Sequence, residues 1–417
     1  MRWLVAVIAL LLGVMACAAL LPVALRALPG RYAYYLPEPL QALRRVEHPD
    51  TLPTPVLVIT PLAPTATATP LSALTPSPAV EPEKPLPTSP PQPTAMPLPA
   101  AHFISGVRHE PQGWNNCGPA TLAMALSYWG CTEMQYDIAP TLKPDPEDKN
   151  VSPEELVAYV ESLGLAATLR VGGDLALLKR LLAHDFPVIV ETWEVRSSQD
   201  QLGHYRLLTG YDDGAQHFLT HDSLDGPDLP VGYQELDELW RVFNRVYLVS
   251  YPPERADEVA ALLGSAWDER IALEQALATA QAEAADPPAA CVAYAACADA
   301  ETFAWFNVGS TLVALERYPE AAAAYDRARQ LGLPWRMLWY QFGPFVAYDA
   351  VGRYEDVIAL ADALLRVTGN LEESYYWRGR ARWAQGDVAG ARADFETALR
   401  HHPGWPPARA ALDEIAE

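Results

Sequence analysis

One cysteine in the sequence lies in a setting that favours nucleophilic chemistry. Cys117 is followed by Gly118 and Pro119, and then by an apolar run that ends at Gly130. Proline fits the first turn of a helix, and glycine commonly follows the last turn. Cys117 is therefore expected at a helix N-terminus, where free backbone N–H groups and the helix dipole stabilise a thiolate. This setting favours a nucleophile over a structural thiol, which is the commonest fate of a free cysteine.

A histidine and an aspartate further along the chain could complete such a site. His204 precedes a strand-like run over residues 205–211, which a hairpin turn signal at residues 212–214 follows. The return strand, residues 216–220, leads to Asp222. Because an antiparallel hairpin brings its beginning and its end together, we expect His204 and Asp222 to be neighbours. Asp222 would then orient His204 and stabilise the charged imidazole.

Together these residues resemble the C39-like peptidases, papain-type cysteine proteases whose relatives trim leader peptides in bacteriocin exporters. The resemblance covers residues 105–252 and rests on five segments: Gln112, residues 116–120, residues 203–205, residues 210–212 and Asp222. It implies an α+β papain-like domain, which we place at residues 101–254. In this domain Cys117 would be the nucleophile, His204 the general base and acid, and Asp222 the residue that orients the histidine. Gln112 would donate its side-chain amide to the oxyanion, beside the backbone N–H of the nucleophile.

Three features depart from the family pattern. Gln112 stands five residues before the nucleophile, where papain-like enzymes more often have six. Ser223 follows Asp222 in place of the usual proline, and Arg206 replaces an aliphatic residue on the strand face of His204. Arg206 is therefore expected either to shift the protonation of the His204–Asp222 pair or to bind a substrate carboxylate.

The same residues leave other functions open. A domain of this fold without turnover would bind peptides or act as a scaffold, and the same triad would serve an amidase or acyltransferase on a non-protein amide. No cofactor is predicted. A metal site at His217 and His221 is disfavoured because Phe218, and not Glu, follows the first histidine. No GxxxxGK[ST] loop occurs in the sequence, so a fused ATP-binding cassette is not expected.

The overall composition suits a protein of several parts and excludes some partners. The chain has 417 residues, of which 50% are hydrophobic and 20% charged, as expected for two or three packed domains. A formal net charge of −22 would repel phosphate backbones, so nucleic-acid binding is not expected. Five cysteines without a CxxC pair predict neither a disulfide scaffold nor a structural zinc site.

The N-terminal hundred residues have the composition of an anchor and a spacer. Residues 3–25 carry no charged side chain and reach the roughly 20 residues that a membrane-spanning helix needs. We predict a signal anchor or transmembrane helix over residues 1–26 and a disordered Pro/Thr-rich linker over residues 27–100, because such a linker cannot bury a core. Cleavage at Ala16-Cys17-Ala18 and lipidation at Cys17 are the alternatives to a retained anchor.

This layout predicts a location. A single-pass anchor followed by a stiff spacer is expected to hold the folded domains outside the cytoplasm of a bacterial cell, bound to its membrane. Cleavage of the N-terminus would instead give a secreted protein. A linker between domains, without any targeting role, is the remaining interpretation.

Helical hairpins are predicted for residues 301–417. Turn segments that begin at Glu316, Gly352 and Gly386 recur at intervals of 36 and 34 residues, a period typical of helix-turn-helix repeats. The pattern resembles three tetratricopeptide repeats, with Gly343-Pro344 interrupting the first helix of the middle one. The resemblance implies a surface that recruits a protein partner or the peptide substrate.

A connecting helix and loop are expected between the two folded parts, over residues 255–300. Cys291 and Cys297 lie near the end of this segment. They form a disulfide there only if a loop brings them together, and otherwise they stay free.

Overall fold

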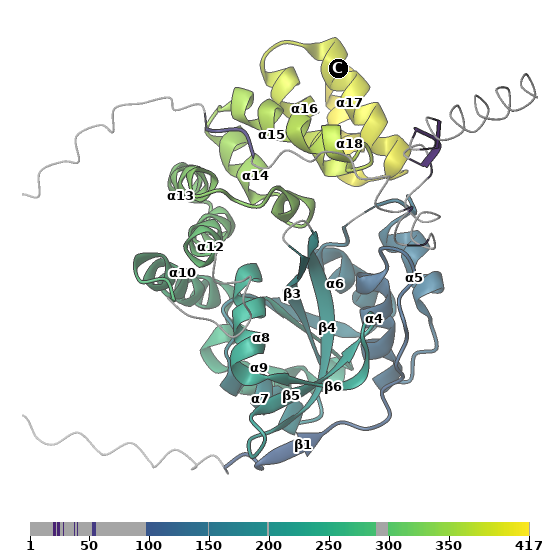
Figure 1. The fold of residues 1–417 in the computed structure, drawn as a ribbon, viewed down its shortest axis with the longest axis vertical. Helices are drawn as coiled ribbons and strands as arrows, with labels where there is room; N and C mark the ends of the chain where they lie inside the picture. The colour runs from purple at the N-terminus through teal and green to yellow at the C-terminus, as the bar shows by residue number, and fades with distance from the viewer. Residues whose placement is uncertain are drawn as a thin grey trace, which may run out of the picture.

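The computed structural model describes residues 97–148, 150–197, 200–288 and 299–416, together with residues 52–55 and positions 20, 21, 23–25, 28, 37 and 40. An α+β domain and a helical C-terminal part make up this structure (Figure 1). Most of the predicted anchor, most of the linker and the Cys291–Cys297 pair lie outside the described residues. Within the described residues, no helix has the length and apolar character that crossing a membrane requires.

The α+β domain is built on an antiparallel sheet. In the described part of the chain the sheet has seven strands in the order β2-β7-β3-β4-β5-β6, and β1 pairs with β4 off this path. Every pair of neighbours is antiparallel. The strands are β1 (Ala101–Phe103), β2 (Ala166–Arg170), β3 (Val188–Ser197), β4 (Asp200–Asp212), β5 (His217–Asp222), β6 (Gly226–Gly232) and β7 (Tyr247–Tyr251).

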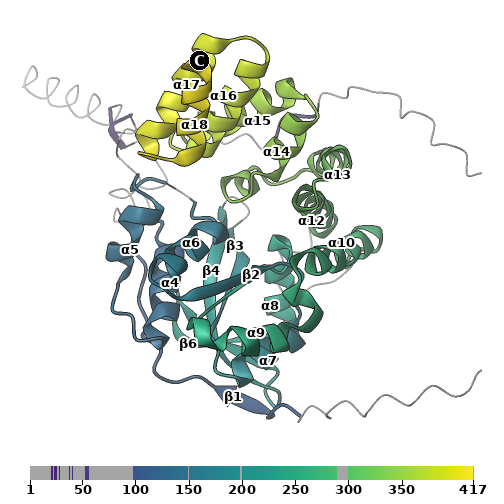
Figure 2. The same ribbon diagram turned by 180° about the vertical axis from the view of Figure 1, so that it is seen from behind.

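Helices cover both faces of this sheet (Figures 1 and 2). One face carries α4 (Cys117–Tyr128), α5 (Gln135–Leu142) and α6 (Pro153–Ser162). The other carries α7 (Leu175–Ala183), α8 (Tyr233–Trp240) and α9 (Ala256–Leu263), with the short turns η1 (Arg241–Phe243), η2 (Pro253–Arg255) and η3 (Gly264–Trp267). Leu207 packs in the cluster under α4 and Leu208 in the opposite cluster, as the alternation of a strand requires.

Sequence signals account for several local features of this domain. The Ser152–Glu155 capping box at the start of α6 is present, with the Ser152 N–H donating to the Glu155 carboxylate at 2.7 Å. Gly130 follows α4 with a φ of 86°, which a glycine adopts without strain. The turn after Asp212 joins β4 to β5, so the predicted hairpin exists.

The C-terminal part confirms the repeat period. Its second helices begin at Tyr318, Tyr354 and Val388, which are 36 and 34 residues apart. A Cβ on Gly379 would lie only 2.6 Å from the ring of Phe395, so glycine allows the paired helices to approach. Residues 299–416 form three helix pairs and a final helix: α12 (Ala300–Ala314) with α13 (Tyr318–Gln330), α14 (Gly343–Ala350) with α15 (Tyr354–Val367), α16 (Glu372–Ala384) with α17 (Val388–His401), and α18 (Pro406–Ala416).

Two local expectations are wrong. Gly343-Pro344 begins α14 instead of interrupting a helix, because Pro344 takes a first-turn position where no N–H is needed, and the short turn η4 (Trp335–Trp339) precedes it. The connecting segment contains α9 and α10 (Glu269–Ala285) rather than one helix, since the η3 turn with Gly264 at a φ of 59° separates them.

The two folded parts share a hydrophobic core. Trp193 on β3 is only 1% exposed, and its ring centroid lies 5.8 Å from that of Phe303 on α12 and 6.2 Å from that of Tyr340. Asn244 in the α+β domain donates a hydrogen bond to Thr311 of α12 at 2.9 Å. The repeats are therefore packed against the α+β domain, and they bring Tyr340 close to the region of His204.

Candidate active site

Cys117 is the first residue of α4 and is partly exposed, as predicted for a thiol at a helix N-terminus. Gly118, Pro119 and the following apolar residues are buried, which fixes the first turn against the sheet. A Cβ on Gly118 would lie 3.1 Å from Val151, so a larger residue would disturb this packing. The sequence thus places the sulfur at the end of the helix where backbone N–H groups are free.

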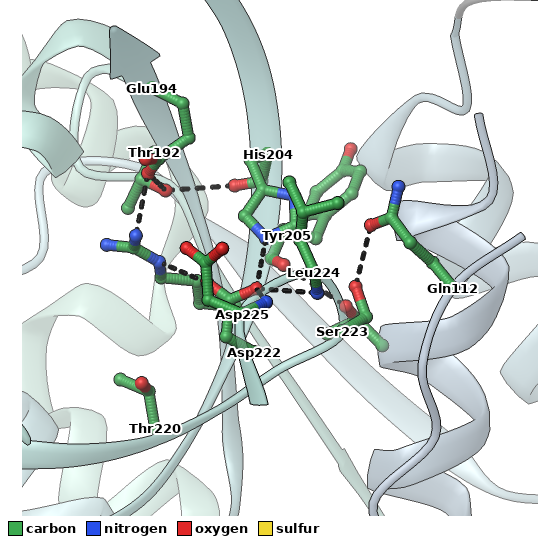
Figure 3. A network of polar contacts seen from close by, with 12 residues as sticks. Gln112, Thr192, Glu194, His204, Tyr205, Thr220, Asp222, Ser223, Leu224 and Asp225 are labelled. Carbon is green, nitrogen blue, oxygen red and sulfur yellow. Dashed lines mark hydrogen bonds and ion pairs between the residues drawn. The ribbon is translucent and has the colours of Figure 1, made fainter. Parts of the chain in front are cut away.

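The β4–β5 hairpin brings His204 and Asp222 together (Figure 3). Arg206 pairs with Asp222 in the ladder, so His204 lies just beyond the last paired residue. The Nε2 atom of His204 is 2.8 Å from Oδ1 of Asp222, and both side chains are 1% exposed. Because Asp222 occupies Nε2, the other ring nitrogen, Nδ1, is the one available to the thiol.

Asp222 is held as a carboxylate by several donors. Its Oδ1 accepts backbone N–H groups of Leu224 at 2.8 Å and Asp225 at 3.1 Å, and its Oδ2 accepts Nε of Arg206 at 2.9 Å. Burial by itself raises the pKa of Asp222, but the hydrogen bond and charge of His204 and the charge of Arg206 hold it well below its ordinary value. The aspartate therefore stays charged in the interior and can stabilise an imidazolium.

Arg206 forms ion pairs with this carboxylate and with a second one. Its guanidinium is 9% exposed and lies 2.9 Å from Oε1 of Glu194 as well as 2.9 Å from Asp222. Thr192 also donates to Glu194, at 3.3 Å, and to the carbonyl of His204, at 3.0 Å. Of the two expected roles for Arg206, its contacts fit the first, because its side chain lies against the His204–Asp222 pair and balances buried negative charge.

The thiol and the imidazole influence each other strongly. Burial by itself raises the pKa of Cys117, but the contact with His204, the charge of the imidazole, the backbone of Tyr205 and the charge of Lys143 together lower it. Burial lowers the pKa of His204, yet Asp222 and Cys117 raise it to about 9. Each group therefore favours the charged form of the other, a thiolate facing an imidazolium.

Cys117 and His204 make no hydrogen bond of standard geometry in this structure. Nδ1 of His204 is buried and has no hydrogen-bond partner among the described residues, although the two groups are near enough to shift each other's pKa. Catalytic hydrogen bonds are often long without substrate and tighten when it binds. The geometry therefore fits a nucleophile and base that meet fully only in a complex.

Gln112 is positioned by the residue that departs from the family pattern. Its backbone N–H donates to the Ser223 carbonyl at 2.8 Å, and the Ser223 hydroxyl donates to Oε1 of Gln112 at 2.9 Å (Figure 3). Within the described residues the amide nitrogen of Gln112 makes no hydrogen bond. Ser223 thus turns the amide so that its N–H groups are available, and the role of Gln112 at an oxyanion stays a prediction.

Three residues near the site were not found from the sequence. Lys143 donates to the carbonyl of Asn115 at 3.0 Å, and its charge lowers the pKa of Cys117. Tyr340 comes from the repeats, and a Cβ on Gly203 would lie 3.1 Å from its ring. Burial and the nearby Cys117 charge raise the pKa of Tyr340.

The third missed residue, Glu191, is a buried acid. It lies opposite Tyr205 in the β3–β4 ladder and is 4% exposed. In the described part of the chain it has no hydrogen bond or ion pair, and burial followed by the charge of Cys117 raises its pKa well above the ordinary value. A single charge inside the apolar run at residues 186–193 was the signal that could have singled it out.

The two histidines considered for a metal site, His217 and His221, both lie on β5. His221 is buried and lies 3.7 Å from the Asp228 carboxylate, while His217 begins the strand. Among the residues with described positions, no group of three or more His, Cys, Asp or Glu side chains could hold a metal ion.

Comparisons with known proteins support the family resemblance. Residues 104–249 match the model of the Peptidase_C39 like family. The peptidase domain of Streptococcus ComA, a bi-functional ABC transporter involved in quorum sensing, is 17% identical, and the match covers 35% of this chain and 98% of that one at a TM-score of 0.29.

A second solved structure that matches is a TPR domain. The first TPR of Spaghetti (RPAP3), bound to the HSP90 peptide SRMEEVD, is 19% identical, and the match covers 28% of this chain and 90% of that one at a TM-score of 0.25. No curated protein sequence matches the chain. The predicted resemblance is therefore confirmed: residues 104–249 match the Peptidase_C39 like family, and a helical region with a repeat period follows them.

Proposed function

We propose that the protein is a cysteine peptidase that hydrolyses peptide bonds through Cys117, His204 and Asp222. One observation carries the proposal: a partly exposed thiol at a helix N-terminus is near enough to a buried imidazole for each to shift the pKa of the other, and this imidazole is 2.8 Å from a buried carboxylate. The family match over residues 104–249 supports the same chemistry.

The proposed reaction is acyl transfer in two steps. The Cys117 thiolate attacks the peptide carbonyl, and its oxygen takes up negative charge. The Gln112 amide and the backbone N–H of Cys117 donate to that oxygen. The protonated His204 gives its proton to the leaving amine, which leaves a thioester. Water then loses a proton to His204 and attacks the thioester, releasing the acid and restoring the thiolate.

Cleavage of a peptide library, read by mass spectrometry, tests this proposal. The wild-type chain is expected to cut a subset of peptides, and a peptide epoxide is expected to alkylate Cys117. His204→Ala should lose both, whereas Cys131→Ser should keep both, because Cys131 lies beyond the C-terminal end of α4, opposite the end that carries Cys117. An uncut library with no adduct on Cys117 would contradict the proposal.

One observation favours a second candidate, a peptide-binding or scaffold domain without turnover. His204 is 1% exposed, and Tyr340 of the repeats stands against the neighbouring Gly203. If this cover stays closed, peptides would bind without being cut. An adduct on Cys117 with an intact library would instead favour the amidase or acyltransferase alternative, which acts on a non-protein amide.

The location and the partner belong to the same proposal. We infer that residues 1–26 hold the folded domains outside the cytoplasm of a bacterial cell, or that the protein is secreted if this segment is cleaved; the uncharged run at residues 3–25 supports this. The helix pairs support recruitment of a protein partner or substrate. Protease treatment of intact cells tests the location, since outside domains would be digested while a cytoplasmic marker survives.

A further inference from the structure

A short piece of the N-terminal linker lies on the repeats. Residues 52–55, the violet segment beside α14 and α15 in Figure 1, have the sequence Leu-Pro-Thr-Pro. Leu52 is 7% exposed and belongs to the hydrophobic cluster of the repeats, and Pro55 is also buried. Thr54 between them is exposed. The segment is therefore anchored by its apolar side chains, with one face left to solvent.

A buried arginine of the repeats holds the backbone of this segment. Nη2 and Nε of Arg329 donate to the Pro53 carbonyl at 2.6 and 3.2 Å. The side chain of Arg329 is 1% exposed, and its Nη1 is 2.8 Å from the carboxylate of Asp356, which is 2% exposed. A buried guanidinium needs an acceptor for each donor direction. Asp356 supplies one, and the linker carbonyl supplies the other.

This contact is separate from the contact between the two domains. Arg329 lies at the end of α13 and Asp356 in the first turn of α15. The repeats contact the α+β domain instead through α12, residues 335–340, α16 and α17. The linker segment is thus bound on its own part of the repeats, away from the candidate active site.

The chemistry of the site suits an extended proline-containing segment. Proline fixes the backbone and has no N–H, so such a segment keeps its carbonyls free as acceptors and loses little entropy when it binds. A charged donor makes a stronger hydrogen bond to a carbonyl than a neutral donor does. The leucine adds an apolar anchor that fixes the register of the segment.

We propose that Arg329 and Asp356 mark a binding site for an extended Leu-Pro-Thr-Pro segment, and that residues 52–55 occupy this site in cis. The contact ties the N-terminal linker to the repeats, and a partner that carries the same pattern would compete for the site. The proposal does not depend on catalysis by Cys117.

A competition experiment with the full chain tests this inference. A fluorescent peptide with the sequence of residues 50–57 is titrated, with fluorescence anisotropy as the readout, against the wild type and against a Leu52→Asp/Leu86→Asp variant. The second substitution removes the other Leu-Pro-Thr sequence of the chain, at residues 86–88. The variant is expected to bind the peptide at least tenfold more tightly, because a tethered occupant competes at an effective concentration of about 1 mM.

Matched substitutions separate the site from general effects. In the same variant, Arg329→Gln is expected to weaken peptide binding about tenfold or more. Arg327→Gln should leave it unchanged, because Arg327 is an exposed residue of the same helix that pairs with Glu301. A peptide with aspartate in place of Leu52 should not bind, which tests the anchor even if Arg329→Gln unfolds the repeats. Equal peptide affinity for the wild type and the Leu52→Asp/Leu86→Asp variant, or binding that is indifferent to Leu52 of the peptide, would overturn the proposal.

Discussion

Buried carboxylates in two regions of the protein have pKa values shifted in opposite directions. At the candidate active site, Asp222 contacts His204 and Arg206, and its pKa lies well below the ordinary value. Where α16 meets the α+β domain, Glu372 and Glu373 lie near Asp148 and Glu155. Burial, followed by the charge of Asp148, raises the pKa of Glu372 to about 9.

The difference lies in the partners. Glu372 lies 3.0 Å from His402, and Glu373 accepts a long hydrogen bond of 3.4 Å from Asn150. The second oxygen of each glutamate is buried without a partner in the described part of the chain. The same kind of side chain is thus a fixed charge beside a cation and a neutral acid where acids crowd together. The first arrangement supports chemistry, and the second makes the contact between the two parts sensitive to pH.

At the candidate active site, the largest effect is expected from removing the thiol that faces His204. Cys117→Ala is expected to lower kcat/KM for a cleaved peptide by about 10⁴-fold or more, because the nucleophile is lost. Peptide hydrolysis rates check this. Cys131→Ser is the matched control and should stay near the wild-type rate; a variant of Cys117 that keeps its activity would remove this residue from the reaction.

Neutralising the carboxylate tests the pairing itself. Asp222→Asn is expected to lower kcat/KM by about 10²- to 10⁴-fold, since the histidine loses its orientation and its stabilising charge. Asp222 raises the pKa of His204 to about 9, so activity that needs the imidazolium should fall as pH rises through about 9 in the wild type and at lower pH in the variant. The pH profile of kcat/KM measures both, and an unshifted alkaline limb would speak against the pairing.

Gln112 and Ser223 separate a donor from the residue that orients it. Gln112→Ala is expected to lower kcat by about 10²-fold, because one donor to the oxyanion is lost. Ser223→Ala should cost less than about tenfold, since it only frees the amide to rotate. Steady-state kinetics on one peptide compare the two. Equal losses would mean that Ser223 acts directly and that the amide orientation is not what matters.

Changes at the Glu372–Glu373 group should alter the free energy of unfolding rather than the rate of catalysis. The native state with Glu372 at a pKa of about 9 binds a proton that the unfolded chain, at about 4.5, has lost, so stability falls as pH rises between these values. Glu372→Gln is expected to remove this penalty and to stabilise the fold by about 1–3 kcal/mol at pH 8 and much less at pH 5.

Denaturant unfolding at the two pH values measures this effect. Glu161→Gln is the matched control, because Glu161 is an exposed glutamate of α6 and should change neither value. A Glu372→Gln variant whose stability relative to the wild type is the same at both pH values would show that the crowded acids are not neutral in the fold.

Local patterns in the sequence predicted the parts of the site that lie on single elements. Cys117 followed from helix signals and His204 with Asp222 from a hairpin, because both depend on residues close in the chain. Tyr340 and the Glu372 group were not predictable, since they arise where the repeats pack on the α+β domain and no local period records that packing. Ser223 looked like a departure from the family, and only its contact with Gln112 explains it.

The contact between the linker and the repeats was not predictable from the sequence either. Its composition predicts an extended chain, but composition does not indicate that residues 52–55 rest on Arg329, 276 residues from Pro53. A buried arginine in a helical repeat gives no sign in the sequence of which carbonyl it will meet.

The pH dependence of Cys117 alkylation tests the central claim most directly. Iodoacetamide rates at Cys117, located by mass spectrometry, are measured from pH 5 to 10 in the wild type and in His204→Ala. We predict that the wild-type thiol reacts as a thiolate below the ordinary cysteine pKa and that His204→Ala moves the profile towards that ordinary value. Identical profiles, both those of an ordinary cysteine, would contradict it.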